Sequence, residues 1–153
     1  MKTYNFCYET GLLQNIVDFS LFEHEKNVLI QIFCGQTKEI LTYISDTLLS
    51  HIPHAICIGT TTDGEVFGDA ITTLRTIISI SIFEDTRIKT AYANDDDSFE
   101  CGMKIASDLI TPTTKLLILG SGSPIPNPYR FGPASARLIR ISGCRGRCLK
   151  TTM

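Results

Sequence analysis

The stretch His54-Ala-Ile-Cys-Ile-Gly-Thr-Thr-Thr-Asp-Gly-Glu-Val66 changes from an apolar, β-forming segment into a polar loop flanked by glycines. In the loop, three adjacent threonine hydroxyls meet the carboxylates of Asp63 and Glu65. Loops that follow strands in α/β proteins place backbone N–H groups and short polar side chains at a sheet edge, where small ligands commonly bind. We therefore predict that a strand at residues 55–58 leads directly into a ligand-binding loop.

The segment before this loop predicts a strand and a helix. Residues 27–33 are apolar and β-branched, and residues 37–49 carry apolar side chains on one helix face, with Thr37 as the N-cap. Pro53 ends the helix, because proline disfavours helical geometry in the residue before it. With a right-handed crossover, the strand at residues 55–58 is expected to run parallel to the first.

The segment after the loop predicts three more strands and a second helix. Residues 75–83 and 86–92 are rich in β-forming residues and are expected to form an antiparallel hairpin. A helix starting near Ser98 follows, and residues 115–119 predict a buried strand. The order β-α-β-β-β-α-β predicts the α/β class, with a mixed β-sheet layered with helices and incomplete at its C-terminus.

Several of these segments carry a recognisable sequence pattern. The loop from Ile58 to Glu65 reads Ile-Gly-Thr-Thr-Thr-Asp-Gly-Glu, and it is preceded by Ile32-Phe-Cys-Gly35. Phe99-Glu-Cys-Gly102 and the strand at residues 115–119 come later in the same order. In both the loop and the order of elements, residues 1–120 resemble the FIST N-terminal domain, whose loop reads roughly Gly-Cys/Thr-Ser/Thr-Thr-x-Gly-Glu.

The resemblance implies a cytoplasmic, non-enzymatic sensory domain of bacterial-type signal transduction. Such domains are proposed to bind a small molecule, such as an amino acid. They are normally coupled to an output domain that is absent here, for example a cyclic-di-GMP turnover domain or a histidine kinase. No cofactor is implied. The sequence has no apolar run near the ~20 residues needed to span a bilayer, and its first residues lack the apolar stretch of a secretory signal.

The composition changes abruptly near residue 120, where the resemblance ends. Residues 1–119 hold all sixteen acidic residues but only eight of the fourteen basic ones, so their net charge is −8. Residues 120–153 hold the other six basic residues and no acidic one. We expect a truncated sensory domain at residues 1–120 and a basic tail at residues 121–153.

Two origins of the tail stay open. The tail is either disordered, as its Gly, Pro and Arg content permits, or translated from a shifted reading frame. Its positive charge would attract phosphates. Because Tyr129 and Phe131 are its only aromatic residues, we expect no specific nucleic-acid partner.

The candidate ligand site combines the loop with the end of the preceding strand. Hydroxyls and backbone N–H groups of the loop could hold a carboxylate, and Asp63 or Glu65 could bind an ammonium group, which suits an amino-acid-like ligand. The alternative is an ordinary turn with locally satisfied side chains. Cys34 could line the same crevice or be a small buried thiol. The residues assigned to the site are Cys34, Gly35, Gly59, Thr60, Thr61, Thr62, Asp63, Gly64 and Glu65.

Catalytic and metal-binding alternatives receive less support. A small α/β enzyme could use Cys34, Thr61, Asp63 and Glu65, but no base is identifiable near the thiol and no reaction class can be assigned. His51 and His54 have no acidic neighbours and favour packing or surface roles over metal binding. We expect no metal site, and we expect the six cysteines to be free thiols.

Overall fold

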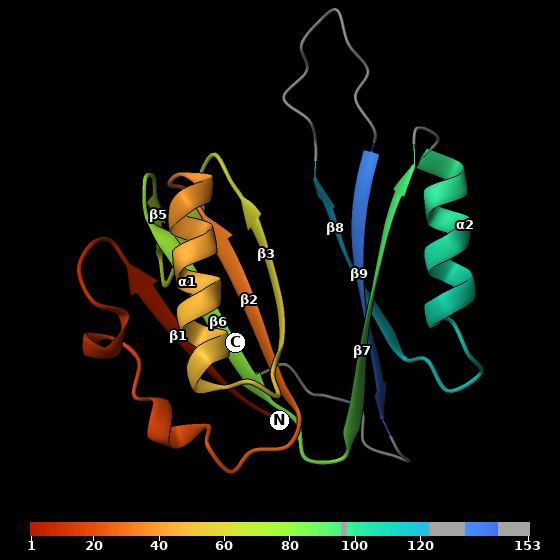
Figure 1. Cartoon of the computed structure of the whole chain (residues 1–153), viewed down its shortest axis with the longest axis horizontal. Coiled ribbons are helices and arrows are strands. Elements are labelled where there is room, and N and C mark those ends of the chain that lie inside the picture. Colours follow the sequence, from red (N-terminus) through yellow and green to blue (C-terminus); the bar gives the residue numbers. More distant parts are fainter. Residues whose placement is uncertain (96–97, 123–133, 144–153) are drawn as a thin grey trace, which may run out of the picture.

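The computed structural model describes residues 1–95, 98–122 and 134–143, which form an α/β structure with two larger sheets and a two-stranded one (Figure 1). In chain order the elements are β1 (Lys2–Tyr8), the 3-10 helices η1 (Leu13–Asn15) and η2 (Phe19–Leu21), β2 (Val28–Cys34), α1 (Lys38–His51), β3 (Ile56–Thr61), β4 (Glu65–Phe67), β5 (Ala70–Thr72), β6 (Thr76–Ile82), β7 (Thr86–Asp95), α2 (Ser98–Leu109), β8 (Leu116–Gly122) and β9 (Ala134–Gly143).

The first sheet has the strand order β1-β6-β2-β3 and mixed direction. Strands β2 and β3 are parallel, as predicted, with Ile30 opposite Cys57. Strand β6 is antiparallel to both β1 and β2. The second sheet has the order β7-β9-β8 and is antiparallel, and β4 and β5 form a separate small hairpin. The prediction of an α/β fold with a mixed sheet is confirmed.

The predicted hairpin between residues 75–83 and 86–92 is wrong. Strand β6 lies between β1 and β2, whereas β7 belongs to the other sheet and pairs with β9. The burial of β6 explains the difference, because six of its seven residues are buried. A strand this buried needs a neighbour on each edge, and β1, which the sequence analysis missed, supplies the second one.

One face of the first sheet carries the main core. Helix α1 lies across this face (Figure 1), and its buried Ile44 and Leu48 pack with Ile30, Ile32 and Ile80 of the sheet. Thr37 is the N-cap residue of α1, as predicted, but its side chain makes no capping hydrogen bond to the backbone. Instead, the Thr37 side chain hydrogen-bonds to the Glu39 carboxylate, and this is the largest of the causes that hold the pKa of Glu39 below its usual value.

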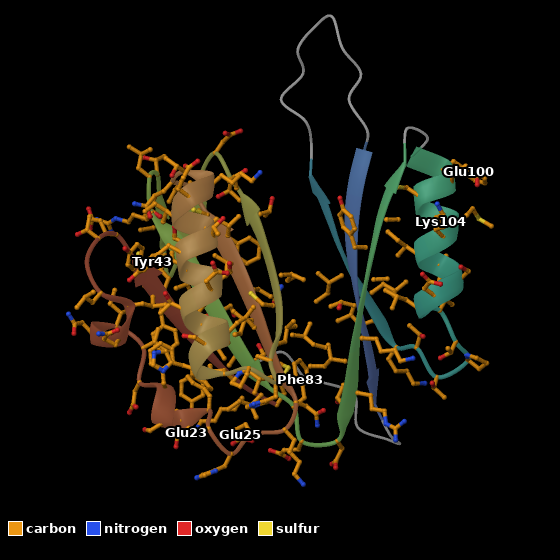
Figure 2. The ribbon with its side chains drawn as sticks, viewed as in Figure 1. Glu23, Glu25, Tyr43, Phe83, Glu100 and Lys104 are labelled. Carbon is orange, nitrogen blue, oxygen red and sulfur yellow. The ribbon has the colours of Figure 1, made fainter. Side chains whose placement is uncertain are left out.

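The three-stranded sheet lies between the four-stranded sheet and helix α2 (Figure 1). On the α2 side, Cys101, Ile105 and Leu109 pack with Ala93. On the other side, Leu29 and Phe83 form a cluster with partly buried isoleucines of both sheets, namely Ile56, Ile58, Ile88 and Ile118. Figure 2 shows Phe83 between the two sheets, where the chain passes from β6 to β7. This cluster joins the two sheets.

Strand β8 is less buried than the sequence suggests. Leu116 is 50% exposed, and Leu117 and Ile118 are only partly buried. The expectation of a buried strand at residues 115–119 is therefore wrong for Leu116. Strand β8 lies at the edge of its sheet, and an edge strand has a neighbour on one side only.

The residues predicted to form the basic tail include strand β9, which pairs with both β7 and β8. The rest of that segment, residues 123–133 and 144–153, lies outside the described residues. The division into a domain at residues 1–120 and a tail stays a prediction. Neither α1 nor α2, the helices of the described residues, has the length and apolar character needed to cross a membrane.

Candidate functional site

The predicted binding loop is shorter than expected, because strand β3 continues through its first residues. Gly59, Thr60 and Thr61 pair with Ile32, Phe33 and Cys34 of β2. Threonine is β-branched and favours strands, so the apolar-to-polar change does not mark the end of the strand. The connection between β3 and β4 consists only of Thr62, Asp63 and Gly64.

Three segments that are distant in sequence meet at this end of the sheet. The Thr62 amide donates to the carbonyl of Cys34 at 2.9 Å and extends the β2–β3 pairing by one bond. The Gly35 amide donates to the carbonyl of Arg75 at 2.7 Å, just before β6 begins. The turn after β2, the connection after β3 and the entry to β6 are therefore fixed relative to one another.

Glu65 is the most unusual side chain in this region. It begins β4, yet only 4% of its surface is exposed. The Thr62 hydroxyl donates to Oε1 of Glu65 at 2.5 Å. Among the described residues, Oε2 is buried and has no hydrogen-bond partner. Because more than nine in ten buried polar groups in proteins are hydrogen-bonded, an unpartnered carboxylate oxygen requires an explanation.

Gly35 provides the space for this carboxylate. A Cβ atom at Gly35 would lie 2.3 Å from Oε1 and 2.6 Å from Oε2 of Glu65. Real Cβ atoms do not approach other heavy atoms so closely. Any side chain at this position would have to displace the Glu65 carboxylate. The observed position of Glu65 therefore requires glycine at position 35, and both residues belong to the predicted site.

A cavity of about 590 Å³ lies beside Glu65. Its sheet side is formed by residues of β1, β2 and β6 that point away from the face that α1 covers, and its other side by the β3–β4 connection, β4 and the turn after β4. The described residues that line it are Asn5, Phe33, Thr62, Gly64, Glu65, Val66, Phe67, Gly68, Ile77 and Ser79.

Of the nine predicted site residues, Thr62, Gly64 and Glu65 line the cavity. Two others point toward the α1 side of the sheet. Cys34 is buried in the main core, and a Cβ atom at Gly59 would meet Leu41 of α1 at 2.8 Å. Thr61 and Asp63 are exposed, and the Thr60 hydroxyl donates only to the adjacent carbonyl of Thr61 at 3.1 Å.

The Cys34 thiol belongs to a polar network on the core side. Its sulfur lies 3.2 Å from the hydroxyl of Thr76 and 3.6 Å from the carbonyl of Thr37. The same Thr76 hydroxyl lies 3.0 Å from Oε1 of Gln36, whose Nε2 donates to the carbonyl of Glu9 at 2.9 Å. These contacts hold the β2–α1 connection against the end of β1.

The lining residues from β1, β2 and β6 were not predicted from the sequence. Asn5, Phe33 and Ser79 come from three strands whose order along the sheet is not visible in the sequence. A signal exists in the alternation of isoleucine and serine along β6, because Ile77 and Ser79 face the cavity while Ile78 and Ile80 face the core. The alternation indicates a site only when the neighbouring strands β1 and β2 are also known.

The described residues offer no centre for metal chemistry. They contain no group of three or more His, Cys, Asp or Glu side chains arranged to hold a metal ion. The His51 ring stacks on the Phe19 ring with a centroid distance of 4.0 Å. The cysteines that the structure describes, Cys7, Cys34, Cys57 and Cys101, form no disulfide with one another.

Comparison with known proteins identifies one family. The family described as FIST N domain matches residues 28–132, which is more than half of the chain. FIST domains are sensory domains of signal transduction. No curated protein and no solved structure matches the chain. The matched region includes the turn with Gly35, the loop with Thr62 and the buried Glu65.

Proposed function

Because the chain belongs to the FIST N domain family and is thus a sensory domain of signal transduction, we propose that it binds a small ligand in the cavity beside Glu65. The ligand carries an ammonium group, and amino acids are the first class to test. The domain acts in the cytoplasm without catalysing a reaction, and it passes its ligand-bound state to a signalling output domain.

The observation that carries this proposal is the Glu65 carboxylate. It is 96% buried, it lines the cavity, and its Oε2 has no hydrogen-bond partner among the described residues. Burying a charged oxygen without a partner is costly. A ligand N–H group would remove that cost by supplying the missing donor, so the site is more favourable when occupied than when empty.

A catalytic function of the same region is less well supported. The Cys34 sulfur is buried on the core side, within hydrogen-bond distance of a hydroxyl and a backbone carbonyl rather than of a base. Activation of a thiol needs a neighbouring base or positive charge. The geometry around Cys34 is that of a packing residue, which favours binding over covalent chemistry.

The proposal is tested by thermal unfolding in the presence of amino acids and related amines. A ligand that binds only the native state raises the melting temperature with its concentration. We expect a rise for the wild-type chain and a loss of this rise in Glu65→Gln. Glu100→Gln on helix α2 is the matched control, since Figure 2 shows Glu100 pointing away from the sheets. Equal shifts in both variants would contradict the proposed site.

A further inference from the structure

We propose that the cavity selects organic ammonium ions that lack a carboxylate, and that it binds them more tightly than the corresponding amino acids. This inference rests on the proposed function and narrows its ligand class. It predicts a sensor of amines with an apolar body rather than of free zwitterionic amino acids.

The charge of the cavity lining is the first argument. Glu65 is the only charged side chain among the described lining residues; the others are apolar, glycine, or the neutral polar Asn5, Thr62 and Ser79. A single buried carboxylate attracts one positive charge. The lining therefore complements a ligand of charge +1, whereas a zwitterion has no net charge.

The second argument is that the described lining residues include no cation to pair with a ligand carboxylate. Arg75, the arginine next to the site in sequence, is absent from the described lining and forms an ion pair with Glu9 at 3.4 Å. A ligand carboxylate would enter a partly buried space that already contains the Glu65 charge, without an opposing cation. Like charges brought together in an interface select against the wrong partner.

The apolar part of the lining is the third argument. Phe33, Phe67 and Ile77 line the cavity together with Val66. These side chains can cover a hydrocarbon body, and aromatic rings also attract ammonium groups. The volume of about 590 Å³ lies within the range of cavities that hold small organic ligands, roughly 300–1,000 Å³.

The position of the carboxylate is the fourth argument. The Thr62 hydroxyl donates a hydrogen bond to Oε1 of Glu65, and the absence of a side chain at Gly35 leaves room for the carboxylate. Oε2 is thus left buried and without a hydrogen-bond partner in the described residues. Thr62 and Gly35 act as positioning residues, and Glu65 contacts the ligand.

The test compares four probes that share a benzyl group, by isothermal titration calorimetry with the full chain. 2-Phenylethylamine and L-phenylalaninol are cations, L-phenylalanine is the matched zwitterion, and 3-phenylpropionate has no ammonium group. We expect both cations to bind at least about tenfold more tightly than phenylalanine, equivalent to about 1.4 kcal/mol. We expect no binding of phenylpropionate.

The Glu65→Gln variant separates this inference from the proposed function. We expect it to weaken binding of both cations by about tenfold or more and to remove their advantage over phenylalanine. If phenylalanine binds as tightly as phenylalaninol and still requires Glu65, the amine selectivity is wrong and the proposed ligand site stands. If no probe binds, the amine inference is wrong; if the probes bind and Glu65→Gln changes no affinity, both proposals are wrong.

Discussion

At the scale of single residues, the position of the Glu65 carboxylate depends on its contact with Gly35. Gly35 lies in the turn after β2 and Glu65 begins β4, and the carboxylate occupies the space that a Cβ atom at position 35 would fill. The Gly35 amide also donates to Arg75, so this turn has little freedom to move away. One atom added at Gly35 should therefore affect both folding and ligand binding.

The Gly35→Ala variant tests this contact. Its methyl group would lie 2.3 Å from Oε1 of Glu65, so we expect the carboxylate to be displaced. Overpacking of this kind costs about 1–3 kcal/mol, and the ligand-induced shift in melting temperature should be lost. Circular dichroism melts with and without 2-phenylethylamine measure both effects.

Gly102→Ala in helix α2 is the control for this variant. A Cβ atom at Gly102 meets no atom within 4 Å, and alanine is favoured over glycine in a helix by about 1 kcal/mol. We expect a stable protein with unchanged ligand binding. If Gly35→Ala behaved like Gly102→Ala, the dependence of Glu65 on Gly35 would be wrong.

Part of the candidate site follows from the sequence as a prediction. The Gly-Glu pattern of the loop drew attention to Glu65, and the end of β2 to Gly35, because each follows a strand. The approach of Gly35 to the carboxylate depends on how β2 and β3 pair, which composition does not reveal. Cys34 and Gly59 were included with their neighbours, although alternate residues of a strand point to opposite faces.

At the scale of elements, β4 lines the cavity, and the hairpin that it forms with β5 exposes apolar side chains. Val66 and Ile71 pair across the hairpin and are 70% and 83% exposed. Leu74, in the connection to β6, is 73% exposed and has a φ of 59°. A bulky residue rarely adopts this left-handed conformation.

The Leu74→Gly variant tests the strain in this connection. Left-handed geometry costs a residue other than glycine roughly 1–2 kcal/mol, and the exposed Leu74 side chain loses little burial. We expect the melting temperature to rise by about 2–4 °C for a chain of this size. Leu12→Gly is the matched control, since Leu12 is 54% exposed with a φ of −90°; it should not be stabilised. A lower melting temperature of Leu74→Gly would show that the connection is not strained.

The elements were predicted best where local signals were strong. Helix α1 and the strands on either side of it follow from apolar periodicity and from Pro53, and their parallel pairing was predicted correctly. Strand β1 and the β4–β5 hairpin were missed, because short segments of mixed polarity carry little periodicity. Missing β1 led directly to the wrong partner for β6.

At the scale of the whole molecule, strand β9 is the central strand of the second sheet. It lies between β7 and β8, which have no direct pairing with each other. The sequence could not place it, because its residues follow the change in composition near residue 120. Its partner β8 is the preceding strand, but its other partner β7 lies before α2, and no local pattern identifies that pairing.

A chain that ends at residue 122 tests the role of β9. Without β9, strands β7 and β8 would expose unpaired backbone groups, which invite association with other chains. We expect the shortened chain to self-associate in analytical ultracentrifugation and to lose hydrogen-exchange protection in β7. A monomer with an unchanged, cooperative melt would instead support an independent domain at residues 1–120.

The position of the ligand site is tested most directly by amide chemical-shift mapping during a titration with 2-phenylethylamine. We expect the largest shifts at Phe33, Thr62, Glu65 and Ser79, around the cavity, and we expect them to disappear in Glu65→Gln. Residues of α2 should be unaffected. Shifts centred elsewhere, or shifts that persist in Glu65→Gln, would contradict a sensory site built on the buried carboxylate.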